Sequence, residues 1–123
     1  MAIFHDLLVK TVQIMPINLV WLFSKKYIAG KTLQSAVNLV KELNAKGILA
    51  TLDVLGESVK TREEAIEAKN KAMEVLDAIV KNKLNANLSI KPTQMGLAID
   101  KELAYKQILE LVKKTSEINN FVR

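Results

Sequence analysis

The order of the predicted elements, a strand and a helix repeated twice before the onset of a third strand, is the feature that most constrains this fold. Residues 48–53 are a short, nearly apolar run, as in strands covered on both faces, and residues 86–91 are predicted to form a second strand. Residues 121–123 resemble the opening of a further strand. Strands joined in this way run parallel through right-handed helical crossovers, so the predicted fold class is α/β. We divide the chain into an N-terminal helical segment (1–30) and the β/α units (31–123).

Three helices with apolar residues at helical spacing accompany these strands. Thr32 caps the first, which Gly47 ends; Thr61 opens the second with Glu64 in a capping box, and Asp100 caps the third. The predicted buried positions are Leu33, Ala36, Val37, Val40 and Leu43 in the first helix, Ala65, Ala68, Ala72, Leu76 and Ile79 in the second, and Ala104, Ile108, Leu111 and Val112 in the third.

The most apolar stretch of the chain, Leu7–Phe23, is predicted to form two short packing helices broken at Pro16. Lys10 and Pro16 interrupt it, and it falls short of the ~20 apolar residues of a membrane-spanning helix. The lysines Lys25 and Lys26 follow the apolar run, whereas a signal peptide has its positive charges first. These features favour a cytoplasmic protein.

Two strands and the start of a third do not form a closed or covered parallel sheet, because both edges remain open. Such units occur in doubly wound sheets and in (β/α)8 barrels, which take about 250 residues. We therefore expect the N-terminal portion of a (β/α)8 TIM-like barrel preceded by short helices, within a larger enzyme. A dimer that pairs the open edges is the alternative.

The formal net charge of +5 is compatible with an anionic partner, so nucleic acid has to be considered. The basic residues, however, share helices with acids at a spacing of four, as in Glu67–Lys71 and Glu110–Lys114, which describes a solvated helical face. Because no basic run is interleaved with aromatic residues, nucleic-acid binding is not expected. The absence of cysteine and the presence of one histidine, His5, exclude thiolate and histidine-rich metal sites.

Opposite charges end the two predicted strands. The period of two places Leu52, Leu88 and Ile90 toward the helices, and the remaining small and polar residues on the other face: Thr51, Asp53, Asn87, Ser89 and Lys91. Neighbouring strands lie ~4.8 Å apart, so Asp53 and Lys91 are able to pair or to share a ligand. Alternatively, Asp53 forms a turn and Lys91 is solvated. Glu57 is a third charge, or an acid that stabilises the start of the next helix.

Four segments resemble bacterial proline dehydrogenase in order and spacing. They are residues 27–33 (YIAGKTL), 51–59 (TLDVLGESV), 90–97 (IKPTQMGL) and 120–123 (NFVR). Together they run from Tyr27 to Arg123, and four motifs in register are far more specific than one. Pro92 stands where bacterial relatives often have leucine, which leaves the neighbouring lysine unaffected.

The resemblance implies a distorted barrel that binds FAD and oxidises L-proline to 1-pyrroline-5-carboxylate, with electrons passing to a membrane quinone and possible peripheral membrane association. By the same resemblance, Lys91 helps to hold the proline carboxylate and the polar network beside the flavin, and Asp53 lies at the substrate pocket. Glu57 pairs with an arginine on the last barrel helix, which closes the site over the substrate. The family's flavin contacts come chiefly from later strands, beyond Arg123, so we expect this chain alone to be inactive.

Two other classes of function remain open. A non-enzymatic interaction module would use the exposed strand edges to bind a partner chain. A barrel aldolase would use Lys91 as a Schiff-base nucleophile.

Overall fold

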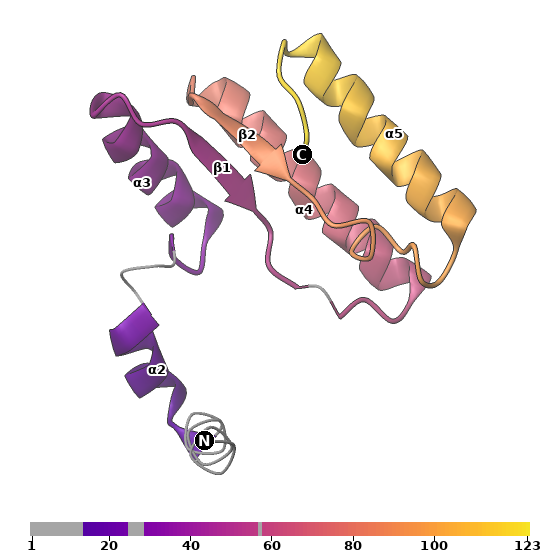
Figure 1. Ribbon diagram of the computed structural model, residues 1–123, viewed down its shortest axis with the longest axis horizontal. Coiled ribbons are helices and arrows are strands. Elements are labelled where there is room, and N and C mark those ends of the chain that lie inside the picture. The colour runs from indigo at the N-terminus through magenta and orange to yellow at the C-terminus, as the bar shows by residue number, and fades with distance from the viewer. Residues whose placement is uncertain (1–13, 25–28, 57) are drawn as a thin grey trace, which may run out of the picture.

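The protein, described by a computed structural model over residues 14–24, 29–56 and 58–123, is a small α/β unit (Figure 1). Its elements in chain order are α2 (Ile17–Ser24), α3 (Leu33–Ala45), β1 (Ala50–Asp53), α4 (Arg62–Lys81), β2 (Ala86–Ser89) and α5 (Lys101–Glu117). The predicted α/β class is confirmed, and both strands are shorter than the predicted ranges 48–53 and 86–91.

Strands β1 and β2 lie side by side and run parallel, as the crossover helix α4 between them requires (Figure 1). Their register pairs Ala50 with Ala86 at one end and Asp53 with Ser89 at the other. The carboxyl ends of the two strands therefore meet at the same edge of the sheet.

The chain returns to β2 after α5. Val122 forms a parallel bridge with Leu88. The backbone N–H of Arg123 donates to the Leu88 carbonyl at 3.0 Å, and the Ile90 N–H donates to the Arg123 carbonyl at 2.9 Å. The predicted onset of a third parallel strand is thus confirmed, and it places β2 between β1 and this segment.

The helix starts follow the predicted caps, with one correction. Thr61 accepts from the Glu64 N–H at 3.2 Å, and Asp100 accepts from the Leu103 N–H at 3.0 Å. The Glu64 carboxylate accepts from the Lys60 N–H at 2.7 Å rather than from the N–H of Thr61. The predicted capping box is therefore only half formed, since the acid binds the residue before the cap.

The apolar core lies between the sheet and the helices, where α4 packs against β2 and α5 (Figure 1). Its buried members are Val37, Val40, Ala72, Val75, Leu76, Ile79, Leu84, Ala86, Leu88, Met95, Ala104 and Leu111. Two predicted core positions are wrong, because Val112 is 42% exposed and Leu33 is 37% exposed. Gln107 and Thr115 lie on the buried face of α5 instead, three and four residues after Ala104 and Leu111, respectively.

Two ion pairs join α4 to α5. Lys69 Nζ lies 2.9 Å from Glu110 Oε2, and Lys114 Nζ lies 3.0 Å from Asp77 Oδ1. The predicted pairing of Glu110 with Lys114 within α5 is replaced by these contacts, since each side chain meets an opposite charge on the neighbouring helix. The predicted Glu67–Lys71 pair is confirmed at 2.6 Å.

Helix α2 begins directly after Pro16, as the predicted break requires, and stands away from the α/β unit (Figure 1). Ile17 and Leu22 are exposed, so these two side chains do not pack as predicted. The first of the two predicted helices falls mostly on residues 1–13, which lie outside the described residues. The ammonium of Lys31 lies 5.3 Å from the centre of the Trp21 ring. None of the helices in the described ranges has the length and apolar character needed to cross a bilayer.

Candidate functional site

The site begins with an ion pair at the carboxyl ends of the strands. Lys91 Nζ lies 2.9 Å from Asp53 Oδ2, and the side chains are 37% and 32% exposed, respectively. The predicted juxtaposition of these two residues is confirmed. Because both side chains are partly exposed, a ligand in solvent is able to reach the pair.

The strand register explains why these side chains meet. Thr51 and Asp53 share one face of β1, and Asn87 and Ser89 lie opposite them on β2. Lys91 follows Ser89 by two residues, so the alternation of side chains directs it to the same face. The opposite face carries Leu88, which is fully buried against the helices. One face of the sheet is therefore polar and open, and the other forms the core.

Asn87 contributes an unusual group to the polar face. Its Oδ1 is buried and has no hydrogen-bond partner among the described residues. A buried polar oxygen without a donor carries a cost of about 1–3 kcal/mol. The strand pattern placed Asn87 on this face, but nothing in the sequence indicated that its oxygen would lack a partner. This oxygen is therefore an unpaired acceptor that lies covered beside the ion pair's strand face.

The arrangement suits a small ligand that carries both charges. Lys91 offers an ammonium donor and Asp53 a carboxylate acceptor, side by side at one edge of the sheet. Such a ligand can replace the contact between the two residues with one charge-assisted hydrogen bond to each. No metal site is indicated in the described ranges, where no three metal-binding side chains gather.

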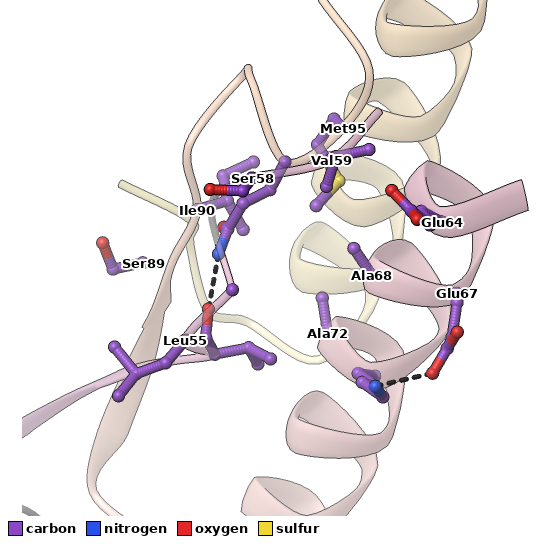
Figure 2. A pocket seen from close by; sticks show the side chains of 14 residues that line it. Leu55, Ser58, Val59, Glu64, Glu67, Ala68, Ala72, Ser89, Ile90 and Met95 are labelled. Carbon is purple, nitrogen blue, oxygen red and sulfur yellow. Dashed lines mark hydrogen bonds and ion pairs between the residues drawn. The ribbon is translucent and has the colours of Figure 1, made fainter. Parts of the chain in front are cut away.

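A separate cavity of about 290 Å³ lies on the helix side, between the β1–α4 connection and α4 (Figure 2). Leu55, Val59, Ala68 and Met95 line it, whereas Asp53 and Lys91 do not. The cavity is thus not the ion-pair site, and its mostly apolar lining includes no buried charge. The third predicted site residue, Glu57, lies outside the described residues.

Glu67 and Lys71 stand at the rim of this cavity, where Figure 2 draws their ion pair. The hydrogen bond from Lys71 and the attraction of its charge hold the pKa of Glu67 below its ordinary value. The same contact raises the pKa of Lys71. Both side chains are solvent-exposed members of one helix, so this shift has an ordinary cause and does not mark a catalytic group.

A search of protein-family models finds no match to this chain. Proline dehydrogenase 1 of Bacillus subtilis is 38% identical over 94 residues, covering 74% of this chain and 31% of that protein. Proline dehydrogenase 2 of the same species is 32% identical over 88 residues, covering 72% and 29%. Proline dehydrogenase of Deinococcus radiodurans is 24% identical over 105 residues, covering 83% and 34%.

The chain spans about a third of the length of the curated relatives that it matches. All three relatives carry the name of one oxidoreductase. The resemblance read from the four motifs is therefore confirmed over about three quarters of the chain.

Proposed function

We propose that this chain, which is homologous to part of bacterial proline dehydrogenase over about three quarters of its length, contributes the first β/α units of an enzyme that oxidises L-proline to 1-pyrroline-5-carboxylate. The observation that carries the proposal is the ion pair of Asp53 with Lys91 at the carboxyl ends of adjacent parallel strands. The carboxyl ends of strands are where (β/α)8 barrels bind and convert substrates.

The strand order supports a barrel. β1, β2 and the segment at Val122 lie next to one another in chain order, all parallel, with α4 and α5 on the apolar side. The polar face with Asn87 and Ser89 would then be the barrel interior. Residues 31–123 would form the first units, and residues 1–30 a helical segment before them. The remaining strands would lie in the part of the relatives that this chain does not match.

Proline carries a carboxylate and a ring ammonium, which gives the two charges of the site their roles. Lys91 would bind the carboxylate, and Asp53 would accept a hydrogen bond from the ring nitrogen. Each contact orients the ring and fixes the reacting C–H bond in space. Oxidation removes a hydride from the ring carbon next to nitrogen and a proton from nitrogen, leaving a carbon–nitrogen double bond. The resemblance assigns Glu57 to an ion pair with an arginine that excludes water.

The residues of the polar face fit part of a flavin site. Lys91 offers a partly exposed cation suited to the polar edge of a ring system, whereas the unpartnered Asn87 Oδ1 is buried beside it. When bound, FAD supplies the acceptor for the hydride. The resemblance assigns the flavin contacts chiefly to later strands, which is why we propose that the 123 residues alone are inactive. The resemblance implies a membrane quinone as final electron acceptor and peripheral membrane contact, which we propose for a cytoplasmic enzyme.

A chimaera tests the proposal. Residues of this chain replace the matching third of Bacillus subtilis proline dehydrogenase 1, and proline-dependent dye reduction is measured together with flavin absorbance. We expect an active flavoprotein, and Lys91→Met to lower kcat/KM about 10- to 100-fold, because a hydrogen bond to a charged group is lost. Lys106→Met, on the exposed face of α5, is the matched control. A folded, flavin-bound chimaera that does not oxidise proline contradicts the proposal.

The alternative functions give different results in direct tests. Schiff-base chemistry requires a neutral amine, whereas Lys91 is here the cationic partner of Asp53. Borohydride trapping of a carbonyl compound on Lys91 would favour the aldolase. An interaction module would elute as one defined monomer or dimer in size-exclusion chromatography.

A further inference from the structure

The backbone pairing of the two strands reaches Asp53 but stops before Lys91. The last paired residues are Asp53 and Ser89, so Lys91 lies two residues beyond the parallel ladder. Parallel strands twist apart once their hydrogen bonds end. Something other than the ladder must keep the segment after β1 close to the segment after β2.

The side-chain amide of Gln94 makes this connection. Its Nε2 donates to the Val54 carbonyl at 2.5 Å, one residue after Asp53. Its Oε1 accepts from the backbone N–H of Lys91 at 3.3 Å. Both contacts are made to the backbone of the two segments that carry the ion pair. The Gln94 amide therefore takes the place of the next rung of the ladder.

Gln94 is itself held firmly. Gln94 is only 3% exposed, and its backbone N–H donates to the Lys91 carbonyl at 2.9 Å. The next residue, Met95, is buried, and its carbonyl accepts from Gln107 Nε2 of α5 at 2.9 Å. Burying an amide is unfavourable unless its groups are paired, and here both Oε1 and Nε2 are paired.

We infer that Gln94 is a positioning residue of the site, which sets the distance between Asp53 and Lys91 by clamping Val54 to the backbone of Lys91. For substrate binding the inference rests on the proposed function. The clamp itself concerns only this chain. Removal of the amide leaves the Val54 carbonyl without its donor and frees the segment at Lys91 to move away from β1.

Nuclear magnetic resonance of the full 123-residue chain tests the clamp without proline or FAD. Two quantities are measured: the scalar coupling across the hydrogen bond from Lys91 Nζ to the Asp53 carboxylate, and the hydrogen exchange of the Lys91 amide. For Gln94→Leu we expect loss of the coupling and at least about fivefold faster exchange of that amide, as for loss of one hydrogen bond.

Gln107→Leu is the matched control, because it removes a second buried glutamine amide that holds the same turn but bridges no strand ends. It should retain the coupling. A folded Gln94→Leu protein with native coupling and native exchange overturns the inference, as does equal loss of coupling in both variants.

Gln94→Glu covers the case in which the leucine variant does not fold. The carboxylate keeps an acceptor for the Lys91 N–H but places an oxygen against the Val54 carbonyl. We expect retained protection of the Lys91 amide with a weakened coupling to Asp53; a native coupling overturns the inference. Because these readouts need no catalysis, an inactive chimaera would refute the proposed function and leave the clamp standing.

Discussion

The ammonium nitrogen of Lys91 lies 2.9 Å from a carboxylate oxygen of Asp53, across the ends of two adjacent parallel strands. The two residues are 38 positions apart in the chain, and the crossover helix α4 lies between them in the sequence. An ion pair with this degree of exposure contributes little to stability, so its value to the protein lies in presenting two opposite charges at a fixed separation.

A double-mutant cycle on this pair measures that contribution. Asp53→Asn, Lys91→Met and their combination should give a coupling free energy below about 1 kcal/mol in urea denaturation, because both side chains are about a third exposed and solvent screens the attraction. Added salt should reduce it further. A coupling above about 3 kcal/mol, as for buried pairs, would show that the site is a structural element.

The meeting of Asp53 and Lys91 could be predicted because alternation along a strand and the meeting of parallel strand ends are local rules. Ionic partners on helices were less predictable. Spacing suggested Glu110 with Lys114, whereas each binds a charge on α4, since the packing of α4 on α5 is a tertiary property. Gln94 escaped prediction for the same reason. Its role depends on where the Val54 carbonyl lies, 40 residues earlier.

The ion pairs between α4 and α5 should be weak and sensitive to salt. Glu110→Gln and Asp77→Asn each remove one partner, of Lys69 and Lys114, respectively. We expect each to lower the free energy of unfolding by no more than about 1 kcal/mol at low salt, and by less at 1 M salt, where the screening length is about 3 Å. Urea denaturation at the two salt concentrations checks this, and an effect that salt leaves unchanged would contradict it.

Leu88 is one of the fully buried leucines of the core. It is fully buried on the central strand, between β1 and the segment at Val122. Leu88→Ala should destabilise the protein by about 2–5 kcal/mol, the range for truncating a buried leucine. Leu97→Ala is the control, since Leu97 is 43% exposed, and it should cost well under half as much. Equal effects in thermal or urea unfolding would contradict the observed packing.

The Glu67–Lys71 pair predicts a defined pH dependence. The hydrogen bond and charge of Lys71 lower the pKa of Glu67 in the folded protein. The Glu67 carboxylate therefore adds to the stability of the fold at pH values above its pKa in the unfolded chain, and this stabilisation is lost as pH falls through its pKa in the folded protein. The pKa of Lys71 is raised in the folded protein, so the stabilisation by the Lys71 ammonium is lost only as pH rises through the pKa of Lys71 in the folded protein. In a titration followed by nuclear magnetic resonance, Lys71→Ala should raise the pKa of Glu67. An unchanged Glu67 titration would exclude the pair in solution.

Gly96 has two reasons to be glycine, and a matched substitution separates them. Its φ is +92°, and an added Cβ would lie 3.1 Å from the Cβ of Ala65 on α4. Gly47 has φ +74° with nothing within 4 Å of an added Cβ, so Gly47→Ala measures backbone strain alone, about 1–2 kcal/mol. Gly96→Ala should cost more in urea denaturation, because it adds the contact with α4 to a comparable strain. It should also speed hydrogen exchange at Gln94, since the turn that carries this side chain is pushed away from α4. Equal losses of unfolding free energy for the two substitutions would mean that the turn at Gly96 moves away from α4 at no cost. That result would contradict a firmly held Gln94.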